Sequence, residues 1–270
     1  MRRRDFVAGA AGFFVAPYPR AQESAYPVID AHCHAGKGYN YGKGDATTPP
    51  WTTYNDPEVI LRRAREADID QSVIFPIENR TFENANEEIA EIVRKYPGKF
   101  IGFAKHDPEH EAGKIGDLLR REVKELGLKG LKLHKAPTRE ILETVAELEI
   151  PILWHPRKVA DFPPVVREHP KTRFIMAHLG NYASMDLAEH ARAIEVARRH
   201  ANVYLETSTV LLVEWLEKAA KELPPEKLIF GSDGPDCDSR VELYKIRLLK
   251  LPQEAERKVL GGNLLGLLGK

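Results

Sequence analysis

The sequence predicts a single α/β domain folded as a (β/α)₈ TIM barrel. Short apolar runs recur along the chain, and a helical pattern separates each run from the next. The runs are continuously apolar, as expected for parallel strands that are covered on both faces. The chain has 270 residues, of which 43% are hydrophobic, and this size suits one barrel over residues 26–268. The expected strands are Val28–Ala31, Gln71–Phe75, Phe100–Ala104, Gly130–Leu133, Pro151–Trp154, Arg173–Ala177, Asn202–Leu205 and Lys227–Phe230.

The segments between these runs have the apolar spacing of helices that cover a sheet. The fifth connection, Val159–Glu168, contains Pro163 and Pro164, so we expect a short or distorted helix there. The other helices are expected at Pro57–Ala67, Asn84–Lys95, Lys114–Leu126, Arg139–Leu148, Ala183–Arg199, Val210–Lys221 and Arg240–Leu249.

An open, doubly wound sheet that binds a nucleotide is the alternative arrangement of such units. Sheets of that kind carry a G-x-G-x-x-G loop after the first strand, or a phosphate-binding loop with its lysine. Neither is present, because Gly36, Gly38, Gly42 and Gly44 are spread over a long loop. The sequence therefore favours the closed barrel.

Residues 1–21 resemble an export signal that precedes the folded domain. Arg3-Arg4-Asp5-Phe6 comes before the apolar run Val7–Ala16, and small residues and prolines follow up to Ala21. The paired arginines resemble a twin-arginine signal. A frayed basic terminus and a membrane anchor are the alternatives; as an anchor, the run has only about half the ~20 residues that span a bilayer. We therefore expect an exported protein, periplasmic or secreted.

Charge composition points to a small molecule as the partner. The chain has 40 basic and 40 acidic residues, and residues 1–21 hold four arginines against one aspartate, which leaves the rest slightly acidic. The sequence has no stripe of basic residues of the kind that binds nucleic acid. No later apolar run is long enough for stable membrane insertion. The oligomeric state is open, a homo-oligomer included.

The two cysteines are too few for a disulfide scaffold. Cys33 lies on the first strand and Cys237 beyond the last, and these strands are neighbours in a closed barrel, so a bridge is conceivable after export. However, Cys33 should face the helices while Cys237 lies in a loop at the mouth. We therefore expect two free thiols.

Polar residues close several of the predicted strands. His32 and His34 are separated by one residue, so an extended strand projects them to the same side. His155, His178 and Asp233 each directly follow or nearly follow a later strand. The carboxyl ends of barrel strands meet at one mouth. Imidazole nitrogens and a carboxylate gathered there are typical ligands of a divalent metal ion.

The motifs around these residues resemble the amidohydrolase superfamily, in its amidohydrolase-related group, sometimes called family 2. The resemblance runs from Tyr26 to Leu268 through VIDAHCH, GLKGLKLH, PILWHP, FIMAHLGN and LIFGSDGP. One departure is Gly234, where the group usually has an aromatic residue. The resemblance implies a barrel of the metal-dependent hydrolase type.

It also implies a role for each polar residue. One divalent ion, with zinc as the first choice, would be bound by His32, His34, His155 and Asp233. Asp233 would also take a proton from a metal-activated water. His178 would stay off the metal and act as acid, base or electrophile. The alternative is that His178 binds a second metal ion, bridged by a carboxylated Lys132; a structural lysine is the simpler reading of Lys132.

Four further residues are candidates for substrate binding. His134 lies on the same face as Lys132 by strand alternation, while Arg80 and Asn181 follow strands and suit an anion or a carbonyl. Trp51 belongs to the long loop Ala35–Asn55, whose aromatic residues suggest a lid and a ring-bearing or apolar substrate. A loop that only covers the barrel mouth is the alternative.

The resemblance leaves the reaction open. The main expectation is hydrolysis of a small-molecule amide, lactone or ester by a metal-activated water. The alternative is non-oxidative decarboxylation of an aromatic or unsaturated carboxylic acid with the same ligands. A catalytically silent, secreted binding protein is the hypothesis of another class, against which the complete ligand set argues.

Overall fold

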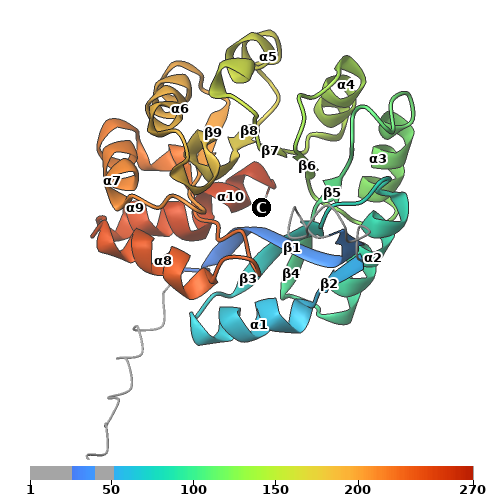
Figure 1. Ribbon diagram of the computed structural model, residues 1–270, viewed down its shortest axis with the longest axis horizontal. Helices are drawn as coiled ribbons and strands as arrows, with labels where there is room; N and C mark the ends of the chain where they lie inside the picture. Colours follow the sequence, from blue (N-terminus) through green and yellow to red (C-terminus); the bar gives the residue numbers. More distant parts are fainter. Residues whose placement is uncertain (1–25, 40–51, 270) are drawn as a thin grey trace, which may run out of the picture.

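The computed structural model describes residues 26–39 and 52–269, and its parallel strands form a barrel surrounded by helices (Figure 1). The predicted export signal and Trp51 lie outside the described residues. All of the predicted strands are present, in two parallel ladders with the orders β1-β3-β4 and β5-β6-β7-β8-β9-β10. The strands are β1 Ile29–Tyr39, β2 Thr52–Asn55, β3 Gln71–Pro76, β4 Phe100–Gly102, β5 Ala104–Lys105, β6 Leu131–Leu133, β7 Ile152–Trp154, β8 Phe174–Met176, β9 Val203–Glu206 and β10 Leu228–Ile229.

The third predicted strand is divided in two where the chain changes partners. At Phe103 the backbone N–H still donates to Ile74 of β3 at 2.9 Å, and the next residue, Ala104, donates to Gly130 before β6 at 2.8 Å. β4 therefore pairs with β3, and β5 pairs with β6. The two ladders are joined here by one continuous segment of chain.

The other join lies between β1 and the segment after β10. Ala31 N–H donates to Phe230 O at 3.0 Å, and His34 N–H donates to Gly234 O at 2.6 Å. A side chain links the same two segments, which we call the seam between the first and last strands. Buried Asp30 accepts hydrogen bonds from the Ser232 amide at 2.8 Å and from the Ser232 hydroxyl at 2.5 Å. The first and last strands therefore close the barrel, as predicted.

Helices follow the strands in the predicted order, with two displaced starts. The helix expected at Ala183 begins only at Leu187, because Ala183 and Ser184 have left-handed backbone angles and Asp186 caps the Ala188 N–H at 2.9 Å. The helix expected from Val210 begins at Val213. The helices are α1 Pro57–Glu66, α2 Glu83–Lys95, α3 Ile115–Lys124, α4 Arg139–Leu148, α5 Phe162–Glu168, α6 Leu187–Arg199, α7 Val213–Glu222, α8 Ser239–Leu248, α9 Gln253–Arg257 and α10 Asn263–Leu267.

The fifth connection contains a short helix, as its prolines predict. A 3₁₀ turn at Val159–Asp161 leads into the seven-residue α5. Pro163 and Pro164 fall in the first turn of α5, where their missing N–H groups have no partner to lose. The ring of Phe162 stacks on Trp154 of β7 with centroids 4.2 Å apart, which fixes α5 against the barrel.

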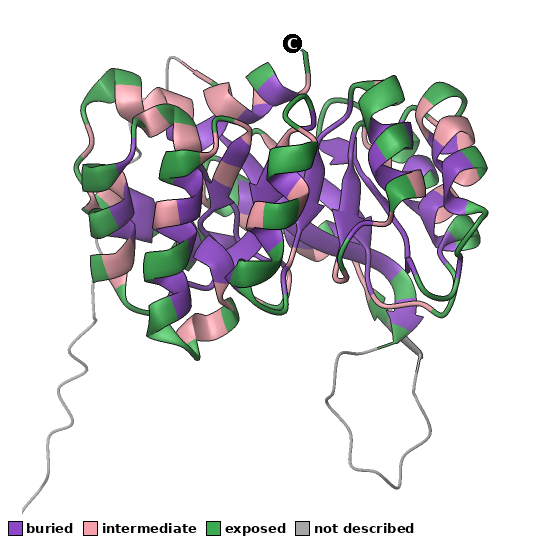
Figure 2. Ribbon diagram, turned by 90° about the horizontal axis from the view of Figure 1, so that it is seen from above, coloured by how far each residue is buried: buried purple, intermediate pink, exposed green. Residues whose placement is uncertain are grey.

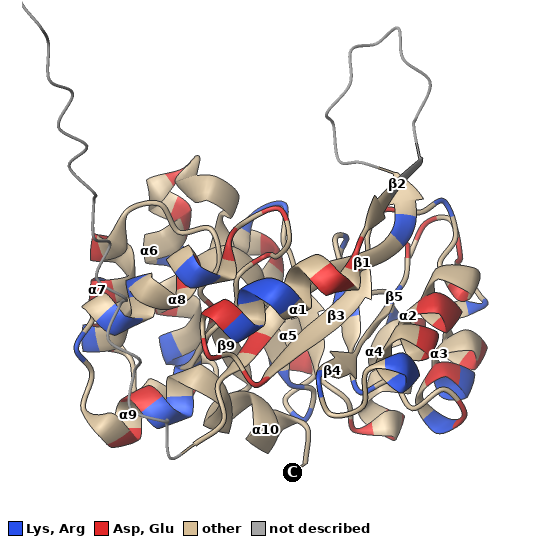
Figure 3. Cartoon of the chain, turned by 90° about the horizontal axis from the view of Figure 1, so that it is seen from below, with Lys and Arg blue, Asp and Glu red and all other residues tan. Residues whose placement is uncertain are grey.

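The apolar core has an inner and an outer layer. Side chains inside the barrel come from several strands, among them Ile29, Val73 and Ile175, and Leu264 and Leu267 of α10 pack against them. The outer layer lies between strands and helices. Figure 2 shows this arrangement, with buried strands at the centre and exposed residues on the outer sides of the helices. α10 and the C-terminus lie at the end of the barrel opposite β2 (Figure 3).

The long loop predicted after the first strand starts and ends as regular structure. β1 continues to Tyr39, and its last residues, from Gly36 on, pair antiparallel with β2. This two-stranded ribbon rises beside the open end of the barrel (Figure 3). Acidic and basic residues are interspersed along the helices in that view. Among residues 26–39 and 52–269, no helix combines the length and apolar character needed to cross a membrane.

Candidate metal centre

A bulge in β1 aims the two histidines of the His-Cys-His motif into the barrel. Ile29 and Ala31 belong to the inner layer, so strict alternation would place Cys33 inside. The pairing with β3 shifts register between Asp30 and Cys33, and this extra residue moves Cys33 to the outer layer. The rings of His32 and His34 then lie together, with centroids 5.4 Å apart.

Asp233 faces both of these imidazoles. Its Oδ1 lies 3.1 Å from His32 Nε2 and 3.2 Å from His34 Nε2. Donor atoms that share one ion at about 2.1 Å stand about 3.0–3.4 Å apart, so these separations fit a bound divalent metal. Asp233 has a left-handed backbone angle, φ 62°, which non-glycine residues adopt rarely. A side chain at Gly234 would press on Ser232 and Cys33, since an added Cβ would lie 3.0 and 3.2 Å from their Oγ and Sγ atoms.

His178 joins this cluster from the segment after β8. Ligand atoms of His32, His178 and Asp233 all lie within 4.8 Å of one another, and all three residues are buried. The resemblance implied His155 as a metal ligand and His178 as an acid or base off the metal, with a second-metal role as the alternative. In the structure the His155 ring lies beside His178, with centroids 4.5 Å apart, and borders the cavity above the cluster. The geometry therefore places both histidines within one constellation.

The segment that carries His178 is strained. His178 and Leu179 both have left-handed backbone angles, φ 58° and 47°, which non-glycine residues adopt rarely. The buried carboxylate of Glu206 accepts the His178 backbone N–H at 3.2 Å and helps to hold this turn. Local strain of this kind is concentrated at sites where a side chain must be aimed.

Glu206, at the end of β9, also supports His32 and is a site residue that the sequence analysis missed. Its Oε2 lies 2.9 Å from His32 Nδ1 and accepts the Ser208 hydroxyl at 2.9 Å. A carboxylate behind a metal-binding imidazole fixes its orientation. The signal was available, because Glu206 directly follows the apolar run Asn202–Leu205, just as the histidines follow theirs.

Lys132 of β6 lies against the same imidazole from the other side. Its Nζ is 3.0 Å from His32 Nε2, and the whole residue is buried. Lys132 therefore points toward the cluster, beside a candidate metal ligand. Its position beside a ligand atom suits either a structural ammonium or the carboxylated bridge, and the latter stays a prediction.

Burial controls the protonation of the cluster. Burial lowers the pKa of His32, His155 and His178 well below the usual value, and the positive charge of Lys132 acts in the same direction. Burial raises the pKa of Asp233, but the surrounding imidazoles outweigh this and hold it well below its usual range. Neutral imidazoles around an ionised carboxylate are the state that binds a metal ion.

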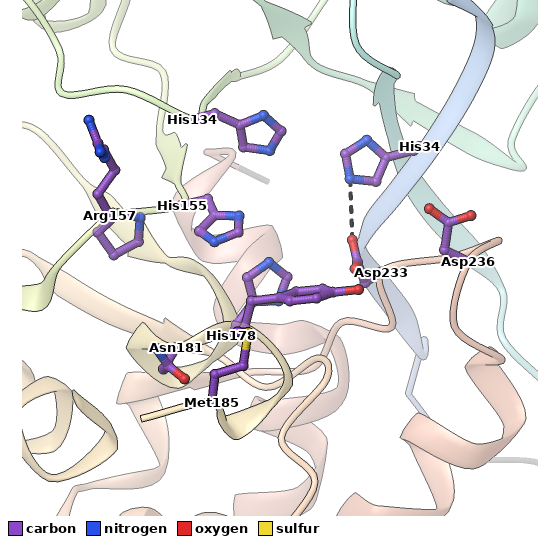
Figure 4. Close-up of a pocket in the computed structure, with 11 residues that line it drawn as sticks. His34, His134, His155, Arg157, His178, Asn181, Met185, Asp233 and Asp236 are labelled. Carbon is purple, nitrogen blue, oxygen red and sulfur yellow. Dashed lines mark ion pairs between the residues drawn. The ribbon is translucent and has the colours of Figure 1, made fainter. Parts of the chain in front are cut away.

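A cavity of about 540 Å³ lies directly over this cluster. Figure 4 shows His134 and His155 on one side, His34 and Asp233 on the other with the ion pair that joins them, and His178 between the two sides. The lining residues are His34, His134, His155, Pro156, Arg157, His178, Asn181, Tyr182, Met185, Asp233 and Asp236.

Two of the four predicted substrate-binding residues line the cavity. His134 and Asn181 line the cavity, although Asn181 Oδ1 also accepts the Asp186 N–H at 2.7 Å. Arg80 is exposed and does not line it. Trp51 lies outside the described residues. The cavity instead offers Arg157 and Tyr182, which follow His155 and His178 closely in sequence and were not predicted.

Both cysteines are free thiols, as expected. Cys33 is buried and its Sγ lies 3.2 Å from Asp30 Oδ2, within the seam between the first and last strands. Cys237 is partly exposed in the loop after Asp233.

Comparisons with known proteins agree with this arrangement. Residues 29–269 match the model of a family described as amidohydrolase, and the chain belongs to that family of enzymes. A search of the curated proteins found no match.

Solved structures with the same fold include both decarboxylases and a hydrolase. 5-Carboxyvanillate decarboxylase from Sphingomonas paucimobilis is 14% identical, with a TM-score of 0.70 over 91% of this chain and 99% of that one. A dihydroxybenzoic acid decarboxylase from Polaromonas with bound manganese and the inhibitor 2-nitroresorcinol is 16% identical, with a TM-score of 0.67 over 90% and 97%. A probable 2-pyrone-4,6-dicarboxylic acid hydrolase from Acinetobacter baumannii with bound citric acid is 15% identical, with a TM-score of 0.67 over 90% and 99%.

Proposed function

We propose that this protein is a metal-dependent, non-oxidative decarboxylase of a small, ring-bearing carboxylic acid. The observation that carries the proposal is the cavity over the His32, His178 and Asp233 cluster, which has a size suited to one small molecule. The similar structures named above support the choice of reaction, since two of them are decarboxylases of aromatic acids.

The cavity has groups suited to an aromatic acid. The Tyr182 ring lies over the site, with its centroid 5.3 Å from His178 and 6.2 Å from His155, and offers an apolar face to a flat ring. Arg157 lines the same cavity and forms no ion pair with any residue in 26–39 or 52–269. Its guanidinium suits a second acidic group on the substrate.

Asp233, His32 and His34 would hold the metal ion, with His155 as the predicted fourth ligand. A divalent ion there would act as a Lewis acid toward oxygen atoms of the substrate. Zinc is the ion that the sequence analysis predicts, and manganese is the ion in the Polaromonas enzyme. We propose one ion of either kind in each chain.

His178 would carry the proton that the reaction consumes. When the bond between ring and carboxylate breaks, carbon dioxide leaves and the electron pair stays on the ring carbon. A new C–H bond then forms at that carbon with a proton delivered by the imidazole. Because His178 is neutral and borders the cavity, it can take up this proton from water and pass it to the ring.

Hydrolysis of a lactone is the second candidate. The similarity to the Acinetobacter baumannii hydrolase favours it, and the same imidazole would then remove a proton from the attacking water. Both candidates need an anionic, unsaturated ring compound in the same cavity.

Product analysis separates the two reactions. Protein loaded with manganese or with zinc would be given dihydroxybenzoates, carboxyvanillates and 2-pyrone dicarboxylates labelled with ¹³C in the carboxyl group. We expect labelled carbon dioxide and a ring with one carboxyl group fewer, and we expect His178→Ala to abolish its release. A ring-opened product with no labelled carbon dioxide would establish the hydrolase instead.

We also propose that residues 1–21 direct export, which rests on their basic and apolar pattern alone. Replacing Arg3 and Arg4 by lysine should retain the protein inside the cell in a fractionation experiment. Export of this variant at the normal level would contradict a twin-arginine route.

A further inference from the structure

We infer that Ser208 and Glu206 are positioning residues that fix the tautomer of His178, with its proton on Nδ1 and a lone pair on Nε2. This inference deepens the proposed function and rests on it, because it states in which form His178 meets the substrate. Nothing in the sequence pattern singled out Ser208, which lies in the segment between β9 and α7.

The Ser208 hydroxyl has only one way to satisfy both of its neighbours. Its Oγ donates to Glu206 Oε2 at 2.9 Å, since a carboxylate only accepts. The same Oγ lies 2.8 Å from His178 Nδ1, and with its own hydrogen already used it can only accept there. The His178 proton therefore sits on Nδ1. Thr209 Oγ1, at 3.1 Å from Nδ1, accepts the Ala183 N–H at 3.3 Å and is available to share the same proton.

Glu206 also sets the tautomer of His32, here by a direct hydrogen bond and not through a serine. Its Oε2 accepts from His32 Nδ1 at 2.9 Å, so the lone pair of that imidazole is on Nε2. The contact of Lys132 Nζ with His32 Nε2 at 3.0 Å agrees, because an ammonium can only donate. One buried carboxylate thus turns the Nε2 lone pairs of two histidines toward the site, one directly and one through a serine.

This arrangement decides the direction in which His178 moves a proton. With Nδ1 committed to Ser208, the nitrogen left to the cavity is Nε2, and it carries no proton in the resting neutral ring. His178 must therefore accept a proton before it can donate one, from water in decarboxylation or from the attacking water in hydrolysis. The imidazolium that results is stabilised by Glu206 through the Ser208 hydroxyl.

The tautomer can be observed without turnover, by ¹⁵N NMR of histidine-labelled protein in the metal-free and zinc-loaded forms. We expect His178 to show a protonated Nδ1 and an unprotonated Nε2, and Ser208→Ala to give a mixture of tautomers. Ser184→Ala is the matched control, because it removes a hydroxyl that lies 2.9 Å from a different buried ring, His190. This control should leave the His178 signals unchanged.

Kinetics then test the role of the serine. Ser208→Ala should lower kcat about 10- to 100-fold with KM and metal content changed less than about twofold, and Ser208→Thr should recover much of the loss because it keeps the hydroxyl. A protonated Nε2 in the unmodified protein, or a Ser208→Ala variant with unchanged signals and kcat, would overturn the inference. If the protein releases no carbon dioxide but shows the expected tautomer, the proposed reaction fails and the positioning role stands.

Discussion

Two buried histidine clusters in this barrel hold their protons in opposite ways. One is the candidate metal centre around His32, His178 and Asp233. The other surrounds His106, which follows β5 and is equally buried. The rings of both clusters contact carboxylates, so burial and negative charge alone do not distinguish them.

The difference lies in what else surrounds each ring, because His32 also contacts two carboxylates, Glu206 at Nδ1 and Asp233 at Nε2. His106 has one for each nitrogen, with Nδ1 3.1 Å from Glu111 and Nε2 2.8 Å from Glu122. Although burial lowers its pKa, these two partners outweigh burial and raise the pKa of His106 to about 9. In the metal centre, His32 and His34 face the same Asp233 oxygen, and burial together with the positive charge of Lys132 keeps their pKa values low. A protonated ring between two carboxylates is a closed ion cluster, whereas neutral rings keep nitrogen lone pairs that can bind a cation.

The largest effect expected from this comparison is on stability. His106→Leu removes the cation between Glu111 and Glu122 and should lower the free energy of unfolding by about 3–5 kcal/mol, as expected when one partner of a buried ion pair is lost. Urea denaturation measures this change. The folded fraction should keep its full metal content, and a loss of metal would mean that the two clusters are not independent.

The second effect is a pH dependence that arises from His106. Because the pKa of His106 is about 9 in the folded protein and about 6.5 when unfolded, its charge stabilises the fold fully below pH 6.5. This contribution, about 3 kcal/mol, is lost as the pH rises through 9. Urea midpoints between pH 6 and 10 measure it against His106→Gln, which is neutral throughout. Parallel pH profiles for the two proteins would show that His106 is uncharged.

A third effect separates the ligand from the proton carrier within the metal centre. His155→Ala should weaken metal binding about 100-fold, or about 2.7 kcal/mol, if His155 is the fourth ligand as the sequence predicts. His178→Ala should bind metal almost normally and lose activity. Competition with a chelator measures both affinities. The reverse order would assign His178 to the metal, in line with its proximity to His32 and Asp233.

The smallest effect concerns the rim of the cavity. Arg157→Ala should raise KM for a substrate with two acidic groups about tenfold, because one charge-assisted hydrogen bond is lost, and should leave kcat almost unchanged. Steady-state kinetics measure this. Arg80→Ala is the matched control, since Arg80 is exposed and lies outside the cavity lining. Equal effects of the two changes would place the substrate elsewhere.

The barrel was predictable from the sequence because its determinants are local. Short apolar strands and amphipathic helices alternate in an order that few folds share, and strand ends bring His32, His155, His178 and Asp233 to one mouth whatever the details of the loops. The comparisons confirm the family to which these motifs point.

The remaining features depend on contacts between distant segments. The bulge that turns His32 inward appears only in the register of β1 with β3. The late start of α6 follows from left-handed residues near His178, and only the folded chain shows that Arg157 lines the cavity while Arg80 does not. His106 also follows a strand, but its ring turns toward Glu122 of α3. A polar residue at a strand end is therefore only a candidate for the site, and packing decides whether its side chain points to the mouth of the barrel or toward the helices.

The central claim is that Asp233, His32 and His34 bind one divalent ion. Anomalous diffraction from crystals of the manganese-loaded protein, collected on both sides of the manganese edge, tests it most directly. We predict a single peak bonded to Asp233 Oδ1 and to the Nε2 atoms of His32 and His34, beneath the cavity and separate from the His106 cluster. The absence of a peak at Asp233, or a second peak bridged to the first by a modified Lys132, would contradict this account.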